Sequence, residues 1–165
     1  MHSISPMYLN SLATLCAILT AVSAAGYFIY KEYRKKQLRY RKKLQGYWTN
    51  EGNIILSKYE THFITVGISI DLEDGELSGV INSTEKGTEN VYMHISLQGR
   101  LRYKRAKIVL SVIKQGRVIE FGKAMIKIIG IGKKLKWRIL KDDNNMFPEY
   151  TILWKTSSSE INDMP

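Results

Sequence analysis

The sequence contains a single cysteine and lacks the motifs of the common catalytic classes. Because Cys16 has no second cysteine to pair with, intrachain disulfides are excluded, as is usual in a reducing compartment. A G-x-S-x-G nucleophile elbow, a G-x-x-x-x-G-K-[ST] phosphate loop and an H-E-x-x-H zinc motif are all missing. The three histidines, His2, His62 and His94, lie far apart in the sequence. We therefore predict no catalytic residues, no enzyme activity and no cofactor.

Acidic side chains gather at expected turns without the spacing of a metal site. One cluster is Asp71, Glu73, Asp74 and Glu76, and another is the segment Asp142-Asp-Asn-Asn145. The second cluster lacks the ligand spacing of a calcium loop. Solvated loops account for both clusters, so we predict no bound metal.

Charged side chains are absent from residues 7–30, and a dense basic block follows at residues 31–43. At about 1.5 Å per residue, such a helix would be roughly 36 Å long, enough to cross a hydrocarbon core of about 30 Å. A cleaved secretory signal carries its positive residues before a shorter apolar run, so the order here favours a transmembrane helix. Basic residues stay on the cytoplasmic side. We therefore expect one span, with residues 1–6 outside and everything after the span in the cytoplasm.

The basic block accounts for most of the net charge. The chain carries +10, and the block contributes eight Lys or Arg minus Glu32, or +7, which leaves about +3 (10 − 7) for the remainder. Such a block attracts anionic lipid headgroups by about 1 kcal/mol per basic residue near the surface. We therefore expect a lipid bilayer as a partner and no DNA binding. The candidate headgroup-binding residues are Arg34, Lys35, Lys36, Arg39, Arg41, Lys42 and Lys43.

Small residues recur at every fourth position of the predicted span. They are Ala13, Ala17, Ala21 and Ala25. A step of four keeps residues on nearly one helix face, and small residues let membrane helices approach closely. This stripe predicts self-association into a homo-oligomer. The hydroxyls of the span could form interhelical hydrogen bonds or bond to carbonyls of their own helix.

From Leu44 onward the pattern alternates between apolar and polar residues, as in half-buried strands. We predict strands near 47–49, 53–59, 61–72, 77–82, 91–97, 103–113, 117–129 and 135–140, with a closing strand at 150–155. Asp74-Gly75 is a strong hairpin signal, while Gly67 and Gly122 lie inside strands and predict bends or bulges. The predicted fold is a membrane-anchored, all-β, antiparallel up-and-down barrel of about eight strands over residues 44–156, followed by a disordered tail at 157–165.

Aromatic residues adjoin arginine and lysine in two predicted strands, in Arg102-Tyr-Lys-Arg105 and Lys136-Trp-Arg138. Aromatic rings that stack on a base, beside guanidinium groups that pair with phosphates, suit a nucleotide site. The alternative is that Trp137 belongs to the core and that the flanking charges form the solvated face. The candidate ligand-binding residues are Trp48, Tyr103, Arg105, Trp137, Arg138 and Tyr150.

The segment Leu44-Gln-Gly-Tyr-Trp48 resembles the opening of lipocalin-type barrels, in which the tryptophan packs across the barrel end. A small barrel directly after a membrane helix resembles the membrane effectors of bacterial antiphage signalling (CBASS and Panoptes-type systems). This resemblance implies an inner-membrane protein whose barrel senses a cyclic di- or trinucleotide and whose helices oligomerise to disrupt the membrane. In the Panoptes-type branch the nucleotide instead holds the effector inactive. Those effectors usually have two membrane helices, and this chain has room for one.

Two other functions fit the same order of parts. The chain could be a bitopic structural subunit of an envelope complex, with the barrel as a docking surface. It could also be a membrane-tethered carrier of lipid or fatty acid. A docking subunit would present an apolar outer patch, and a carrier would need a long apolar cavity.

Overall fold

The computed structural model describes residues 6–51, 62–87 and 91–156. The predicted strand at 53–59 and the predicted tail at 157–165 lie outside the described residues. The chain divides into two compact units, Met1–Lys36 and Gln37–Pro165.

Helix α1 (Pro6–Leu44) confirms the predicted N-terminal helix and continues through the basic block. Alanine, leucine, lysine and arginine dominate this segment, and all four are strong helix formers. The helix ends before Gly46, whose φ of 120° favours glycine. By length and composition, its part from Ala13 onward could cross a membrane. The side chains of residues 13–36 are exposed.

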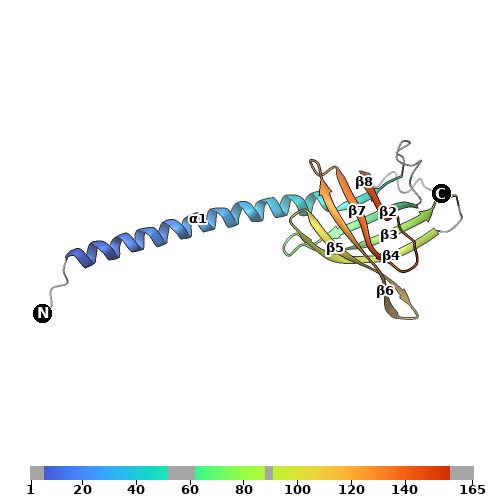
Figure 1. The fold of residues 1–165 in the computed structure, drawn as a ribbon, viewed down its shortest axis with the longest axis horizontal. Helices are drawn as coiled ribbons and strands as arrows, with labels where there is room; N and C mark the ends of the chain where they lie inside the picture. The colour runs from blue at the N-terminus through green and yellow to red at the C-terminus, as the bar shows by residue number, and fades with distance from the viewer. Residues whose placement is uncertain (1–5, 52–61, 88–90, 157–165) are drawn as a thin grey trace. The chain divides into compact units, whose positions relative to one another are not determined.

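Eight antiparallel strands form a closed barrel in which every strand pairs with its neighbours in sequence and β1 pairs with β8 (Figure 1). This arrangement confirms the predicted up-and-down barrel. The strands are β1 (Gly46–Thr49), β2 (His62–Ile70), β3 (Glu76–Glu85), β4 (Val91–Arg102), β5 (Arg105–Lys114), β6 (Arg117–Ile129), β7 (Lys134–Asp142) and β8 (Tyr150–Thr156).

The barrel interior is filled by apolar side chains. Ile64, Val66, Ile68 and Ile70 of β2 are all buried, in the alternation that the sequence predicts. Two tryptophans, Trp48 and Trp137, are fully buried with 0% exposure. The Trp48 indole N–H donates to the Leu44 carbonyl at 2.8 Å. The Trp137 indole N–H donates to the Pro148 carbonyl at 3.2 Å. Both rings therefore belong to the core, and each has a partner for its one polar group.

The predicted irregularity at Gly122 is a bulge. Gly122 pairs with Leu110, but Ser111 pairs with Glu120, so Phe121 is the extra residue on β6. The bulge turns both Phe121 and Gly122 inward, and this explains the phase slip in the sequence pattern. No register shift occurs at Gly67.

The turn between β2 and β3 forms where Asp74-Gly75 predicts it, but it is longer than a two-residue hairpin. It spans residues 71–75, and the Asp71 N–H donates to the Glu76 carbonyl at 2.8 Å. The Asp71 carboxylate accepts from the backbone N–H groups of Glu73 at 2.6 Å and Asp74 at 3.2 Å. These bonds lower the pKa of Asp71. An Asx-type turn thus replaces the expected tight loop.

Candidate functional site

The end of helix α1 is built into the barrel. Gln37 is 6% exposed and Leu44 is fully buried. The compact barrel unit accordingly begins at Gln37 rather than at Leu44, the predicted boundary. The last two turns of the helix and the strands therefore form one structural unit, and we call their contact region the helix–barrel junction (residues 37–44 and the turns they touch).

The turn between β4 and β5 holds the first part of the junction. The Tyr103 N–H donates to the Gln37 side-chain oxygen at 3.2 Å. The rings of Tyr40 and Tyr103 pack edge to face with centroids 5.1 Å apart. The Lys104 ammonium lies 5.2 Å from the Tyr40 ring centroid and 5.7 Å from that of Tyr103. A hydrogen bond with Tyr40 raises the pKa of Tyr103.

Two further turns hold the helix end through basic side chains. The Arg41 guanidinium donates to the carbonyls of Leu72, at 2.8 Å, and Glu73 in the β2–β3 turn. The Lys43 ammonium donates to the Ile131 carbonyl at 2.8 Å, in the turn between β6 and β7. These bonds differ from the predicted contact of Arg41 and Lys43 with lipid headgroups, because this part of the helix faces the barrel turns. Arg34, Lys35, Lys36, Arg39 and Lys42 are exposed.

Some hydrogen-bond donors at the helix–barrel junction lack a partner among the described residues. The side-chain nitrogen of Gln37 and Nε of Arg41 are buried without a hydrogen-bond partner among the residues that the structure describes. Each such group costs on the order of 1–3 kcal/mol. Tyr103 has a φ of 57°, a left-handed conformation that is unfavourable for a residue other than glycine. The contact between helix and barrel therefore combines several hydrogen bonds with two unpaired donors and one residue in an unfavourable conformation.

Seven basic side chains lie on the outer wall of β4–β7, which we call the basic face. They form two rows across neighbouring strands. The first row is Arg102, Arg105, Lys127 and Lys136, and the second is Arg100, Lys107 and Arg138 with Met125 between the last two. Strands lie about 4.8 Å apart and alternate residues about 7 Å apart, so the basic face measures roughly 14 by 7 Å.

Like charges oppose one another across the strands of the basic face. The directly paired positions are Arg100–Lys107, Arg102–Arg105, Arg105–Lys127 and Lys127–Lys136. Like charges in this position destabilise a sheet, on a scale of about 0.2–1 kcal/mol per pair. None of the seven side chains forms an ion pair with a residue that the structure describes. The Arg100 guanidinium Nε–H donates to the Asp74 carbonyl at 3.1 Å, in the β2–β3 turn. No described carboxylate neutralises the charge of this face.

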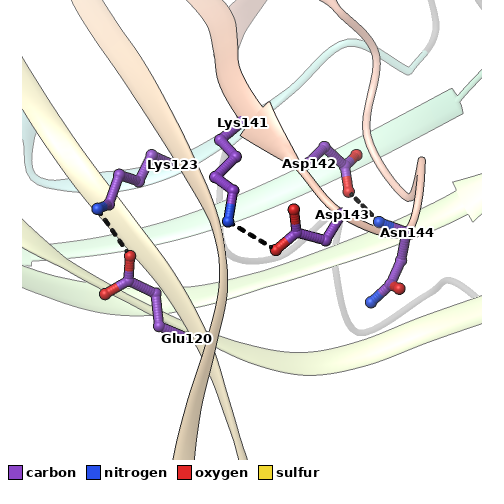
Figure 2. Close-up of polar contacts among 6 residues, drawn as sticks. All are labelled: Glu120, Lys123, Lys141, Asp142, Asp143 and Asn144. Atoms are coloured by element: carbon purple, nitrogen blue, oxygen red, sulfur yellow. Dashed lines mark hydrogen bonds and ion pairs between the residues drawn. The ribbon is translucent and has the colours of Figure 1, made fainter.

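Elsewhere on β6 and β7 the same kind of pair is neutralised. Lys123 and Lys141 also oppose one another. Figure 2 shows that each has its own acidic partner: Lys123 lies 2.9 Å from Glu120, and Lys141 lies 3.0 Å from Asp143. Lys114 and Arg117 also oppose one another without a described ion pair, at the β5–β6 hairpin. The basic face differs from that single pair in bringing seven cations together over four adjacent strands.

A surface hollow of about 570 Å³ lies within the basic face over β4, β5 and β6. It is lined by Arg100, Arg102, Arg105, Ala106, Lys107 and Met125. This volume falls in the range of small-molecule sites. The hollow brings together four cations and one polarizable thioether.

The candidate ligand-binding residues divide between the core and the outer wall. Trp48 and Trp137 are core residues, which for Trp137 is one of the two alternatives left open by the sequence. Arg105 and Arg138 belong to the basic face. Tyr103 and Tyr150 are exposed at its edges, by 47% and 48%.

Tyr150 extends the second row of the basic face. It pairs with Arg138, and the Lys136 ammonium lies 4.6 Å from the Tyr150 ring centroid. The candidate ligand-binding residues leave out five cations of the basic face. Arg102 and Lys136 stand in the two aromatic–basic segments of the sequence, whereas Arg100, Lys107 and Lys127 were not predicted. A signal in the sequence could have identified them, because each occupies an outward-facing strand position next to a buried residue.

The small residues and the hydroxyls of the predicted span lie on the exposed part of helix α1. The side chains of Ala13, Ala17, Ala21 and Ala25 are all exposed. The hydroxyls of Thr20 and Ser23 donate to the carbonyls of Cys16 and Leu19, each at 2.8 Å. These two hydroxyls therefore bond within their own helix, which was one of the two alternatives.

The described residues define a class of architecture: an apolar helix whose end is built into a closed eight-stranded barrel with a basic outer wall. Comparison with known proteins finds no family model, no curated protein and no solved structure that matches the chain.

Proposed function

We propose that the chain is a single-pass effector of the bacterial inner membrane. In this proposal the cytoplasmic barrel binds a cyclic oligonucleotide, and the bound state of the barrel controls the association of membrane helices. Associated helices then disrupt the membrane as an antiviral response. The observation that carries the proposal is the helix–barrel junction, because the last turns of helix α1, residues 37–44, are bonded to turns of the barrel.

The exposed helix supports the membrane part of the proposal. Leu15, Ile18, Leu19 and Val22 are each more than half exposed, at 57–64%. Large apolar side chains on a helix of this length require lipid or other helices around them. The basic residues after the apolar run favour a cytoplasmic barrel.

The junction supports the control of the helix by the barrel. Turns from three hairpins hold residues 37–44, so a change in the wall of the barrel reaches the helix through direct contacts. The unpaired donors of Gln37 and Arg41 leave the junction less stable than a fully bonded contact. A ligand that favours one junction geometry could then shift its population, provided that it binds the two geometries with different affinities.

Among the described residues, the packed core of the barrel disfavours the tethered-carrier alternative. A carrier needs a long apolar cavity, whereas the interior positions hold the buried apolar side chains, with Trp48 and Trp137 among them. The docking-subunit alternative keeps one supporting observation: Ile113 and Val118 are each 72% exposed and pair across the β5–β6 hairpin. We favour the effector because the basic face supplies charge suited to a phosphodiester.

The helix stripe provides a test of the effector function. Replacing Ala17 and Ala21 by leucine adds bulk at the proposed helix contact, so membrane permeabilisation in cells that contain the ligand should fall at least tenfold. Dye uptake by intact cells measures this, and ligand affinity of the purified chain should not change. Ser23→Leu is the matched control, since it adds similar bulk on another helix face.

Unchanged dye uptake in the double alanine variant would remove the stripe from the mechanism. Fractionation and protease protection test the membrane topology separately. Recovery of the intact chain as a soluble species, or digestion of the barrel by protease outside sealed spheroplasts, would contradict the proposed anchoring.

A further inference from the structure

We propose that the hollow on the outer wall of β4–β6 is a binding site for a soluble ligand that carries two or more phosphodiester groups. The inference rests on the proposed function for its biological role, but the chemistry follows from the basic face alone. Arg100, Arg102, Arg105 and Lys107 bind the phosphates, and Met125 forms the apolar floor against which a base packs. Lys127, Lys136 and Arg138 continue the positive surface beside the hollow.

The uncompensated charge is the first argument for this site. Four like-charged pairs face one another on adjacent strands, with no described acid paired to any of them. A folded domain gains no stability from this arrangement. An anion bound between the rows would convert the repulsion into attraction, and arginine pairs with phosphate in a bidentate manner.

The geometry of the hollow specifies a ligand with more than one phosphate. Arg102 and Arg105 face each other in one row, and Arg100 and Lys107 face each other in the next. The rows are separated by two residues along each strand, or about 7 Å. One phosphate reaches one pair, so a ligand that engages both pairs needs two anionic groups at about that spacing. The thioether of Met125 lies opposite Lys107 and offers a polarizable contact for an aromatic base.

The curvature of the wall favours a small soluble ligand over a bilayer surface. The basic face covers four of the eight strands of a closed barrel, so it wraps around about half of the wall. A flat anionic surface can touch only part of such a wall at once. The hollow of about 570 Å³, in contrast, gathers four of the cations around one volume.

Isothermal titration of the full chain in neutral detergent micelles tests the site. The probes are a cyclic dinucleotide, a cyclic trinucleotide and a ten-nucleotide single strand, with inorganic phosphate for comparison. We expect at least one phosphodiester probe to bind, and we expect the double variant Arg105→Gln/Lys107→Gln to weaken that binding at least tenfold. Inorganic phosphate should bind far more weakly, because it engages only one pair of cations.

A matched control removes the same charge elsewhere. Lys114 and Arg117 are another directly opposed pair, at the β5–β6 hairpin away from the hollow. Lys114→Gln/Arg117→Gln should leave the affinity within about twofold of wild type. The melting temperature of the Arg105→Gln/Lys107→Gln variant should be equal to or higher than that of wild type, because like-charge repulsion is relieved. A loss of affinity without a loss of stability distinguishes a binding site from a structural one.

A further titration uses vesicles that contain phosphatidylserine. Three results would overturn the inference: binding by none of the phosphodiester probes, equal loss of affinity in the two double variants, or binding only to these vesicles. The last result would assign the basic face to lipid headgroups. Failure of the effector function is separable, because a chain that binds the probe at the hollow but never permeabilises membranes keeps this site and loses the proposed role.

Discussion

The basic side chains of this protein differ in the groups that surround them, and Arg100 has both kinds of neighbour, since it opposes Lys107 and also donates to the Asp74 carbonyl. Lys43 and Arg41 donate to turn carbonyls and hold the helix end. Arg105 and Lys107 instead face other cations across the sheet. The local sequence looks alike in both places, since each segment is rich in arginine and lysine. The pairing between strands separates them, and it is not readable from neighbours along the chain.

Asp71 gives a test at the scale of a residue. Backbone hydrogen bonds from Glu73 and Asp74 lower the pKa of Asp71 below its unfolded value of about 3.9. Its contribution to stability is therefore complete above about pH 5 and is lost as the pH falls through the lower, folded pKa. Asp71→Asn should reduce stability at pH 7 and should lose less of it between pH 5 and pH 2 than wild type does.

Urea denaturation at a series of pH values measures this difference. Glu149→Gln, an exposed carboxylate outside the turn, serves as the control and should keep the pH dependence of wild type. Parallel pH profiles for Asp71→Asn and wild type would show that the turn carbonyls, not the carboxylate, stabilise this end of the barrel.

At the scale of elements, the end of helix α1 is where the structure differs most from the sequence-based prediction. The basic block reads as a juxtamembrane segment, but its last residues pack into the barrel and Gln37 is buried. Periodicity predicts that the helix exists and cannot say which residues meet a distant turn. The contact of Gln37 with Tyr103 joins residues 66 positions apart, so it depends on barrel closure.

Gln37 provides the test at this scale. Gln37→Met keeps a similar length but removes both the acceptor for the Tyr103 N–H and the unpaired donor nitrogen. Loss of a hydrogen bond costs about 1 kcal/mol, and removal of the unpaired buried donor offsets much of that. We therefore expect little change in stability or ligand affinity, with a loss of the ligand-dependent response of the helix. Titration and membrane permeabilisation together measure the two properties.

Gln45→Met is the matched control, because Gln45 is exposed just beyond the helix end. Its affinity and its response should both match wild type. A Gln37→Met variant that still responds fully would move the coupling to the other turns, those that bind Arg41 and Lys43.

The strands themselves were largely predictable, for a reason that also explains the exceptions. Alternation along β2 encodes a buried face directly, and the slip at Gly122 encodes the bulge. Trp137 fits the same alternation, so its core position follows from pattern, whereas its nucleotide-stacking role required an exposed ring. Prediction of the basic face requires the register between neighbouring strands, and the alternation of apolar and polar residues does not fix that register. Four of its seven cations, Arg102, Arg105, Lys136 and Arg138, stand beside aromatic residues in the sequence, and only Arg105 and Arg138 were named as candidates.

At the scale of the whole molecule, the helix–barrel junction connects the wall that carries the proposed site to the end of helix α1. Arg102 and Arg105 flank the β4–β5 turn, and that turn contacts Gln37 and Tyr40. A ligand in the hollow therefore lies next to the element that holds the helix. The response needs a difference in binding energy between two states of several kcal/mol to be nearly complete.

The lone cysteine allows the most direct measurement of this central claim. Cys16 is exposed on the helix, about 100° around the axis from Ala17. Oxidative cross-linking of the intact chain in membranes therefore reports the close approach of two helices at this position with no added label. We predict that a phosphodiester probe that binds the barrel changes the yield of Cys16-linked dimer at least threefold, and that Arg105→Gln/Lys107→Gln abolishes the change. A dimer yield that stays constant while the probe saturates the barrel would contradict the account.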